Sequence, residues 1–591
     1  MEARTYVTFS ELFDRRPVMH ELVELIKKIP LRHAVLVISR LNMAVRFVME
    51  EGSGEDFAKV QKRLIEDHLD DDIHALLRER LRTARLEDRP IFLPQCLLSI
   101  LRLVLVQCDP VPQPTLEEDE FVRLSIGRAC LIMNDLLITT EEEGKLVNGS
   151  DDERRIGLMV QAMSGFEVAN SPRAEHLIRR LKIMYLLVLQ NPQVKARIAQ
   201  LHQGFDFENT FLELVGITLE RWLYVIFMIY AYFLDGANEF GRNPAHMVLS
   251  PSTFCGESGI TQETLEIVLS TISMTTSKLK ETIESEKLTD PRYDFVSFRS
   301  FPLLIAQADR LLPLDIAFIV DKCHAGVQWT MHDRIQTWKG RQTLFNAWGD
   351  LFQEYVHWLL GGMKTNLPVK YIPSPNYEND SAHETFDGIL LQDGDFVALE
   401  YKGGFLSRTA RYSGDSKTFL GELDGKFADG CDQLADHLGA VFCDNSDTRK
   451  RIAGFTSDQT ESVRSIVPVL VLQDHIFRVP FLNWYLNKRF ERSVGKYTLR
   501  PGLNICPLTV VPIQELESMV YAAEGNDFDF IHALKNRTVI DKKVLSDLLD
   551  WLLSCDGFKG GTSSRVERAL AELNVKILEY VFPSSGLRQF D

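Results

Sequence analysis

The sequence predicts a multidomain protein of the α plus α/β class, in which a large α-helical N-terminal region precedes a mixed β-sheet flanked by helices. Three observations predict this class. The chain has 591 residues, enough for about three to five folding units. Its first half carries one amphipathic helical pattern after another. After Thr337 the pattern becomes helix, three strands, helix and strand, an order typical of a mixed sheet covered by helices.

The N-terminal region, residues 1–285, has apolar residues at helical spacing. In Met19–Ile29, Leu22 and Ile26 recur on one helix face with charged residues between them. Similar runs predict helices over Phe57–Leu86, Leu97–Val106, Phe121–Leu137, His176–Leu189 and Thr264–Ile283. We expect this region to serve in sensing, regulation or oligomerisation.

One segment of this region, Trp222–Leu234, is apolar without interruption. A membrane-spanning helix needs about 20 such residues, and here Glu220 and Arg221 precede the run and Asp235 follows it. The segment therefore predicts a helix buried inside an α-helical domain. We expect no membrane partner.

The composition narrows the function classes. The net charge of −17 argues against a globally basic protein that wraps nucleic acid, although a local basic patch can still steer a ligand. The nine cysteines form no CxxC pair, which excludes a zinc ribbon or thioredoxin-like site. Single cysteines and an N-terminal segment unlike a signal peptide predict a cytoplasmic location.

The remaining chain is expected to form three parts. Residues 286–340 predict a bridging segment with short strands, 341–512 the sheet domain, and 513–591 a C-terminal helical module. In the sheet domain, the expected elements are a helix at Gln342–Leu360, strands at Val369–Ile372, Glu384–Gln392 and Asp395–Gly403, a helix at Phe419–Leu438 and a strand at Ile466–Leu472.

A hairpin in this domain brings two acids together. The dipeptide Asp393-Gly394 between two apolar runs predicts a two-residue turn. The ladder that follows from this turn places Asp387 directly opposite Glu400, with Cβ atoms about 5 Å apart. Because strand side chains alternate, Lys402 lies on the same face as Glu400.

Two opposed carboxylates in an apolar sheet are destabilising unless something compensates their charge. A divalent cation would do so, because Mg²⁺ (or Mn²⁺) prefers carboxylate oxygens and keeps waters for a phosphate ligand. Lys402 would then hold or deprotonate an attacking water, or stabilise charge on the phosphate. The alternative is an exposed edge hairpin with a surface pair between Glu400 and Lys402.

Asp387, followed after a gap by Glu400-Tyr401-Lys402, resembles the pattern of the PD-(D/E)xK nuclease superfamily. The order of elements in residues 342–474 is similar to the restriction-endonuclease-like core of that superfamily, although Phe386 stands where the pattern has proline. The resemblance implies a metal-dependent nuclease, with DNA favoured over RNA. Asp387, Glu400 and the Tyr401 carbonyl would bind Mg²⁺, and Lys402 would assist the attacking water.

The resemblance also implies supporting residues. Members often carry a further acid on the helix before the strands, and Glu354 fits that position, although it also reads as an ordinary solvated glutamate. Many place a polar residue on the helix after the lysine strand, for which Gln433 or Lys426 qualifies. By analogy with similar fusions, the chain is an anti-phage or restriction-type effector whose activity a homo-oligomer or a partner protein controls.

Basic residues that would contact nucleic acid occur in two places. One group lies in a segment with interleaved aromatic residues, and the other follows the Glu400–Lys402 strand. Basic groups bind phosphates and aromatic rings stack on bases. An amphipathic helix whose aromatic side chains form core is the alternative for the first group. The residues are Lys488, Arg489, Arg492 and Lys496 in the first group, and Arg408 and Arg411 in the second.

Two rival functions stay open. The first is a non-catalytic scaffold whose nuclease-like domain only binds nucleic acid or a partner, although the intact set Asp387, Glu400 and Lys402 argues against a decayed site. The second is a helical structural protein in which the pattern is a coincidence. Metal-dependent binding that is lost in Asp387→Ala would favour the enzyme.

Overall fold

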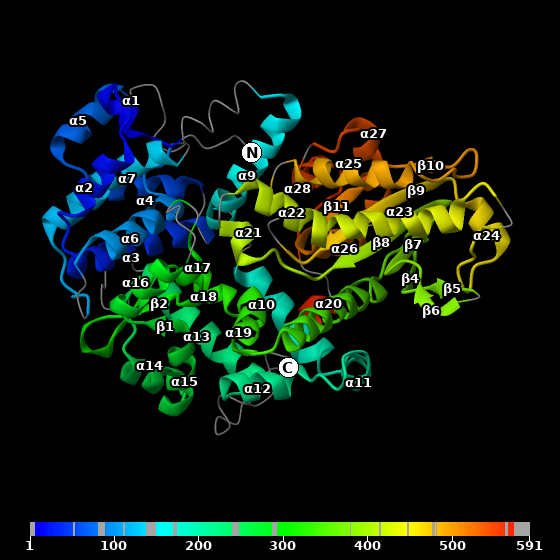
Figure 1. Ribbon diagram of the computed structural model, residues 1–591, viewed down its shortest axis with the longest axis horizontal. Coiled ribbons are helices and arrows are strands. Elements are labelled where there is room, and N and C mark those ends of the chain that lie inside the picture. Colours follow the sequence, from blue (N-terminus) through cyan, green and yellow to red (C-terminus); the bar gives the residue numbers. More distant parts are fainter. Residues whose placement is uncertain are drawn as a thin grey trace.

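A computed structural model describes residues 6–571 apart from short gaps at 51–53, 81–88, 110–112, 138–148, 170–173, 239–246, 287–291, 293, 379, 413–414, 446–447, 475–478, 480, 527, 546 and 562–564. The protein is mostly helical, with an N-terminal helical region and a later mixed six-stranded sheet flanked by helices (Figure 1). This is the fold class that the sequence predicts. The last part of the predicted C-terminal module, 572–591, lies outside the described residues.

The first helices pack around one apolar core. They are α1 (Phe9–Phe13), α2 (Met19–Ile26), α3 (Leu31–Glu50), α4 (Gly54–His68), α5 (Asp71–Arg80), α6 (Pro94–Gln107) and α7 (Glu120–Leu136). The single run expected from Phe57 is divided between α4 and α5. Asp70 causes the break, because its carboxylate accepts the N–H of Ile73 at 2.9 Å and so begins a new helix.

A second group of helices connects this core to the sheet. It comprises α9 (Asp151–Ala169), α10 (Ala174–Ile183), the π-helix η2 (Met184–Val188), α11 (Pro192–Leu201), α12 (Phe207–Val215), α13 (Leu219–Asn238), α14 (Pro251–Ser258), α15 (Gln262–Ile272), α16 (Thr276–Ser285) and α17 (Val296–Ser300). The apolar segment from Trp222 lies in α13, where Trp222, Ile226 and Phe233 are fully buried. The expected buried helix is confirmed.

Among the described helices, none is by itself long and apolar enough to cross a membrane. Together, α12 and α13 have the length and apolar composition that a membrane span needs, but the pair is bent by 63° between Val215 and Leu219.

The bridging segment contains two short strands, as its sequence predicts, and a third precedes it. This third strand, Ser273–Met274, divides the helix expected over Thr264–Ile283 into α15 and α16. β1 (Ser273–Met274), β2 (Leu303–Ile305) and β3 (Leu311–Pro313) form a three-stranded sheet in that order. The turn η4 (Gln307–Asp309) and the helices α18 (Ile316–Asp321) and α19 (Ala325–Arg334) complete the segment.

The large sheet has the strand order β10-β9-β8-β7-β4, and β11 also pairs with β9. Its strands are β4 (Lys370–Pro373), β7 (Gly388–Gln392), β8 (Asp395–Lys402), β9 (Ser465–Leu472), β10 (Asn504–Ile505) and β11 (Thr509–Pro512). β8 is antiparallel to β7 and parallel to β9. A separate two-stranded sheet joins β5 (Asn376–Tyr377) to β6 (Asp380–Glu384).

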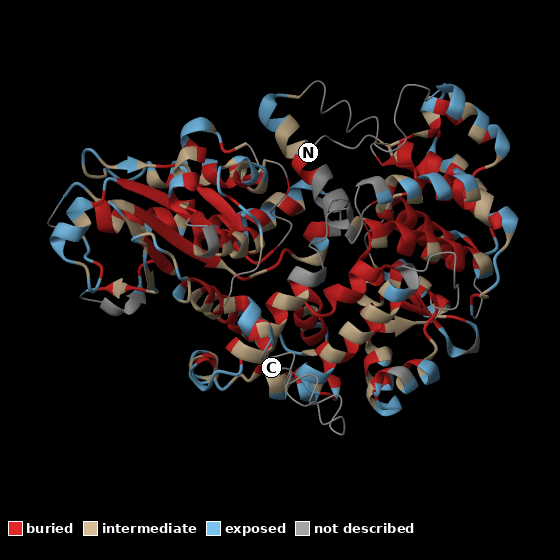
Figure 2. Cartoon of the chain, turned by 180° about the vertical axis from the view of Figure 1, so that it is seen from behind, coloured by how far each residue is buried: buried red, intermediate tan, exposed pale blue. Residues whose placement is uncertain are grey.

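Helices cover both faces of the large sheet, and its strands are buried along most of their length in Figure 2. The helix before the strands is α20 (Trp338–Gly361); those after β8 are α21 (Arg408–Tyr412), α22 (Ser416–Lys426), α23 (Ala428–Phe442), α24 (Ser457–Ser462), α25 (Leu482–Val494), α26 (Ile513–Asn526), α27 (Phe530–Ile540) and α28 (Leu548–Ser554). α20 and α26 pack on the face that carries Val397 and Leu399, whereas α22, α23 and α25 pack on the face of Phe396 and Ala398.

In the sheet domain, two expected elements differ from the structure. The strand predicted from Glu384 to Gln392 is divided, because β6 ends at Glu384 and β7 begins at Gly388. Pro375 explains the division, since its carbonyl accepts both the N–H and the hydroxyl of Thr385 at 2.7 Å and turns the chain away from the large sheet. The helix expected from Phe419 to Leu438 is two helices, α22 and α23, that meet at Phe427.

Candidate active site

The hairpin between β7 and β8 positions the two acids. Asp393 and Gly394 have φ values of 47° and 86°, the left-handed backbone that a type I′ turn requires. The ladder runs from Gln392 opposite Asp395 to Gly388 opposite Leu399. The predicted register is therefore confirmed, and the next positions along it are Asp387 and Glu400.

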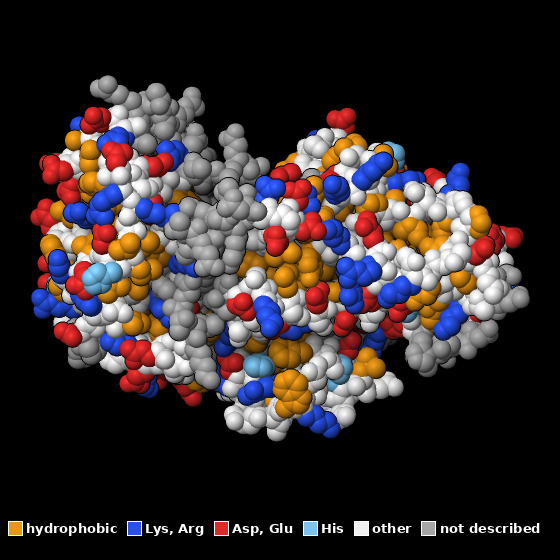
Figure 3. All heavy atoms as spheres, turned by 45° about the horizontal axis from the view of Figure 1, so that its top comes forward, with side chains coloured by type: hydrophobic (Ala, Val, Ile, Leu, Met, Phe, Trp, Pro, Cys, Tyr) orange, Lys and Arg blue, Asp and Glu red, His pale blue; other side chains and the backbone are white. Residues whose placement is uncertain are grey.

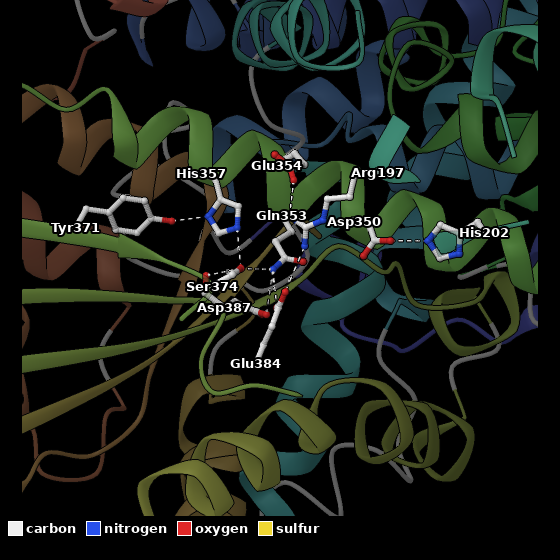
Figure 4. A network of polar contacts seen from close by, with 10 residues as sticks. All are labelled: Arg197, His202, Asp350, Gln353, Glu354, His357, Tyr371, Ser374, Glu384 and Asp387. Carbon is white, nitrogen blue, oxygen red and sulfur yellow. Dashed lines mark hydrogen bonds and ion pairs between the residues drawn. The ribbon is translucent and has the colours of Figure 1, made fainter. Parts of the chain in front are cut away.

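Asp387 lies where the β7–β8 ladder ends. Its Oδ2 accepts the backbone N–H of Tyr401 at 2.6 Å, so a carboxylate takes the place of a strand partner. From α20, the amide nitrogen of Gln353 lies 3.4 Å from Oδ1 of Asp387 (Figure 4). The acid is thus fixed against the backbone of β8, while its second oxygen makes only a long contact.

Glu400 and Lys402 face α23 from the end of β8. The Lys402 ammonium donates to Oε1 of Glu400 at 2.8 Å and to Oε1 of Gln433 at 2.6 Å. Glu400 is only 6% exposed. Of the two residues considered for the polar position on the later helix, Gln433 contacts the lysine, whereas Lys426 donates to the carbonyl of Phe405.

Burial and proximity shift the protonation of all three groups. Burial, followed by the charge of Glu400, raises the pKa of Asp387 well above its usual range. Burial also raises the pKa of Glu400, against the opposing effect of Lys402. Burial alone would lower the pKa of Lys402, but the charge and hydrogen bond of Glu400 more than offset it, so that pKa is raised. A partly buried and a buried carboxyl group beside a single ammonium resist full ionisation.

A chain of polar groups supports the opposite side of this end of the sheet. His357 of α20 contacts the hydroxyl of Tyr371 through Nδ1 at 2.5 Å and the hydroxyl of Ser374 through Nε2 at 3.1 Å (Figure 4). Tyr371 in turn lies 3.2 Å, oxygen to oxygen, from Tyr401. Burial, with a further contribution from Arg197, lowers the pKa of His357 to about 4. His357 is therefore a neutral positioning group at pH 7.

The predicted additional acid, Glu354, is held by the helical region. Arg197 of α11 donates to Glu354 at 2.7 Å and reaches Glu384 at 3.4 Å. Gln353 also lies 3.5 Å from Glu384, and the charge of Glu384 adds to the rise in the pKa of both Asp387 and Glu400. The structure thus brings Asp387, Glu400 and Lys402 together. Arg197 links the helical region to this site through its ion pairs with Glu354 and Glu384.

The first predicted nucleic-acid group lies on and after α25, in a surface where charges of both signs are mixed (Figure 3). Lys488 pairs with Asp152 of α9 at 2.6 Å, and Arg489 pairs with Asp432 at 2.6 Å. Arg492 and Lys496 are exposed, whereas the neighbouring rings of Trp484 and Phe490 are buried. These two rings serve as core, as in the amphipathic alternative. The contacts to nucleic acid stay a prediction.

The second group follows β8. Arg408 of α21 pairs with Asp333 at 2.8 Å and lies over the ring of Trp329, 5.0 Å from its centroid. Arg411 is 3% exposed and pairs with the buried Asp474. For Arg411 to contact nucleic acid directly, this buried ion pair would have to open.

The donor set at the hairpin suits a hard cation that keeps some of its waters. It offers the carboxylates of Asp387 and Glu400 and the carbonyl of Tyr401, all oxygen ligands. Within the described residues, no cluster of three or more His, Cys, Asp or Glu side chains is arranged to hold a metal ion. A cation at this place would therefore be bound by two carboxylates. The raised pKa values of Asp387 and Glu400 mean that the protein itself does not supply enough positive charge to keep both ionised.

Comparison of the chain with protein-family models, with curated proteins and with solved structures finds no match. The assignment of this site therefore depends on the geometry and chemistry of its own residues. Sequence reasoning missed Arg197, Gln353, Glu384 and Tyr371. The position of His357, one helical turn after Glu354, predicts that it lines the same face or packs in the core, but not that it contacts Tyr371. Only the position of Gln353 beside Glu354 could have drawn attention to it, because the other contacts depend on how distant segments fold together.

Proposed function

We propose that the chain is a metal-dependent nuclease that hydrolyses phosphodiester bonds of nucleic acid, with DNA favoured over RNA. The observation that carries the proposal is the meeting of Asp387 and Glu400 at the end of the β7–β8 ladder, with the Lys402 ammonium 2.8 Å from Glu400. The charge of Glu400 acts on the partly buried Asp387 and destabilises its ionised form, and a bound cation would offset this repulsion.

Mg²⁺ or Mn²⁺, when bound by Asp387, Glu400 and the carbonyl of Tyr401, would polarise the phosphate and lower the pKa of a bound water. Burial raises the pKa of both carboxyl groups, so a bound cation would stabilise the ionised forms that its binding requires. Tyr401 is fixed by the bond from its N–H to Asp387, which also fixes the direction of its carbonyl.

Lys402 has the reach to act on the attacking water or on the phosphate. Its ammonium is held between Glu400 and Gln433, so a change in the charge on Glu400 would release it towards substrate. Water would then form a bond to phosphorus and lose a proton to solvent, while the bond from phosphorus to the 3′ oxygen breaks and that oxygen takes up a proton from solvent. The products are a 5′-phosphate and a 3′-hydroxyl.

The helical region is proposed to control this activity, alone, as a homo-oligomer or with a partner protein. Two contacts support the proposal. Arg197 of α11 pairs with Glu354 beside the site, and Asp152 of α9 pairs with Lys488, a predicted nucleic-acid contact. By analogy, such an arrangement suits a cytoplasmic anti-phage or restriction-type effector.

The test compares wild type with Lys402→Met on plasmid DNA, linear DNA and RNA, each with Mg²⁺, Mn²⁺ or EDTA. Lys426→Met is the matched control, because Lys426 lies on α22 and bonds Phe405 instead of Glu400. Cleavage that needs metal, survives in Lys426→Met and falls at least about 100-fold in Lys402→Met supports the nuclease. Cleavage at the wild-type rate in Lys402→Met would overturn the site.

A scaffold that binds nucleic acid without cleaving it is the second candidate. It is favoured by the internal pairing of the site, since Lys402 bonds Glu400 and Asp387 accepts the backbone N–H of Tyr401. The two functions separate in a binding measurement with an oligonucleotide. Affinity that rises with Mg²⁺ and loses this rise in Asp387→Ala supports the enzyme, and affinity independent of metal and of Asp387 supports the scaffold.

A further inference from the structure

A hollow between the helical region and the sheet region is lined by four basic side chains and one acid, Asp321, among other residues. It lies among α17, α18, α19 and α21 and has about 370 Å³ of space, part of it open to solvent. Arg299 reaches it from α17, Arg408 and Arg411 reach it from α21, and Lys322 lines it from the residue that follows α18. The ring of Trp329 forms part of its wall.

The three arginines of this hollow each have an acidic partner. The pairs are Arg299–Asp321 at 2.7 Å, Arg408–Asp333 at 2.8 Å, and Arg411–Asp474. Their guanidinium charges are therefore balanced within the protein, so a fourth cation leaves the hollow with an excess of positive charge.

Lys322 is that fourth cation. Its side chain is buried, with 5% of the residue exposed, and within the described part of the chain the structure gives its ammonium no hydrogen-bond or ion-pair partner. Burial, opposed by the charge of Asp321, lowers the pKa of Lys322 to about 7. A buried ammonium without a partner is strongly disfavoured, so an anion in the hollow would satisfy a group that the chain itself leaves unsatisfied.

The start of α19 adds a second set of donors. Its N-cap residue, His324, gives no side-chain bond to the first turn, and the first two helical residues, Ala325 and Gly326, line the hollow. The free N–H groups at a helix start attract anions. A Cβ on Gly326 would lie 2.6 Å from the carbonyl oxygen of Asp321 and 3.2 Å from Cδ of Lys322, so glycine allows the lysine to approach the helix start.

From this geometry we infer that the hollow is an anion site that takes a phosphate group, held by Lys322 and the start of α19 with Arg408 at the rim. A phosphate has enough acceptor oxygens to satisfy the ammonium, the helix-start N–H groups and a guanidinium at the same time. The group would come from free phosphate or a mononucleotide, or from the phosphorylated end of a nucleic acid. The inference does not rest on the proposed nuclease function.

Binding here would act on two parts of the chain at once. α18 and α19 belong to the segment before the sheet, whereas α21 follows β8 directly. Asp474, the partner of Arg411, comes just after β9 and also accepts the N–H of Leu406 at 3.1 Å, in the stretch between Lys402 and α21. An anion in the hollow would therefore tie α21 to α19 close to the end of the strand that carries Lys402.

The test is calorimetric titration of the full chain with inorganic phosphate. Lys322→Met replaces the ammonium by an apolar group of similar length, and removal of a buried charge should leave folding intact. Lys542→Met, at an exposed lysine, is the control. We expect wild type and Lys542→Met to bind equally and Lys322→Met to bind at least about tenfold more weakly. Equal binding by all three proteins would overturn the inference.

A second measurement uses sulfate, whose charge stays constant across the range. The charged groups that act on Lys322 are Asp321, Asp333, Arg299 and Arg408. Burial raises the pKa of Glu286, which acts on Arg408, to about 7, so wild type is compared with Lys322→Met and only the pH dependence that the variant loses is assigned to Lys322. Sulfate should therefore bind at least about tenfold more tightly at pH 6, where Lys322 is protonated, than at pH 9. Affinity that is unchanged over this range would contradict the assignment.

The source of the phosphate group is identified by competition. Adenosine monophosphate and a 5′-phosphorylated oligonucleotide are each titrated, and the same oligonucleotide without its 5′-phosphate is the control. A mononucleotide or strand end that binds through Lys322 supports the inference and names the source. Equal binding of the phosphorylated and unphosphorylated strands, unaffected by Lys322→Met, would count against it.

Discussion

A Cβ atom on Gly430 would lie 2.7 Å from Cε of Lys402. Helix α23 can pass this close to the end of β8 only because residue 430 has no side chain. The same absent atom would lie 3.4 Å from Cγ of Glu400. Gly430 therefore sets the space in which the lysine lies between Glu400 and Gln433.

Gly430→Ala should displace Lys402 and lower both stability and activity. Forcing an extra methyl group into such a space costs about 1–3 kcal/mol, and we expect metal-dependent cleavage to fall at least about tenfold because the ammonium moves. Urea unfolding and a cleavage assay measure the two effects. Gly425→Ala, where a Cβ meets nothing within 4 Å, is the control and should be neutral or slightly stabilising. Equal behaviour of both variants would refute the role of Gly430.

Asp387→Asn should stabilise the metal-free protein. Burial and the charge of Glu400 raise the pKa of Asp387 above its unfolded value, so the acid opposes folding increasingly as the pH rises from about 4 towards the folded pKa. Thermal unfolding in EDTA should show a higher Tm for the variant at pH 8 and little difference near pH 4. Mg²⁺ should raise the Tm of wild type alone. A lower Tm for the variant at pH 8 would contradict this account.

Arg197→Gln should strengthen metal binding. The change removes a positive charge that pairs with Glu354 and Glu384, and a partly exposed pair of this kind contributes up to about 1 kcal/mol. The dissociation constant for Mg²⁺, measured by calorimetry, should fall about two- to fivefold. Lys195→Gln on the same helix, which loses only a pair with Glu208, should leave it unchanged. Weaker binding in Arg197→Gln would disprove the electrostatic argument.

Lys322→Met should change how stability depends on pH. Burial lowers the pKa of Lys322 from 10.5 to about 7, so between these values the unfolded chain binds more protons than the folded one. The free energy of unfolding therefore rises with pH across that window, and the cost of burying the ammonium is complete below about pH 7. The variant should be more stable than wild type at pH 7, by an amount on the order of a few kcal/mol, and the difference should shrink towards pH 10. Urea unfolding of both proteins at a series of pH values measures this difference. A difference in the free energy of unfolding that stays the same at every pH would contradict the prediction.

The hairpin could be predicted because its signal is local. Asp393-Gly394 demands a left-handed turn, and the alternation of side chains then fixes that Glu400 and Lys402 share a face. The flanking helices also follow from periodicity. The division of the strand before Gly388 could not be predicted, since it depends on Thr385 bonding the carbonyl of Pro375.

The surroundings of the site lay beyond sequence reasoning for a physical reason. Arg197 is 157 residues from Glu354 along the chain, and no pattern of spacing indicates which of many arginines will pair with it. Likewise, no sequence pattern indicates that Lys322 and Arg408 line one hollow, because this depends on how α18 and α21 pack. By contrast, the aromatic residues beside Lys488 were correctly considered as possible core, because an amphipathic helix must bury one face.

Trp348 of α20 shows that the sheet is not a separable module. Its indole N–H donates to the buried Gln473 at the end of β9 at 2.9 Å, and its ring meets the edges of Tyr185 and Phe207 from the helical region. One apolar core therefore runs through both regions. A truncated chain that began near residue 341 would expose this tryptophan to water, so the sheet region and the helical region would have to be inherited and expressed as a single piece.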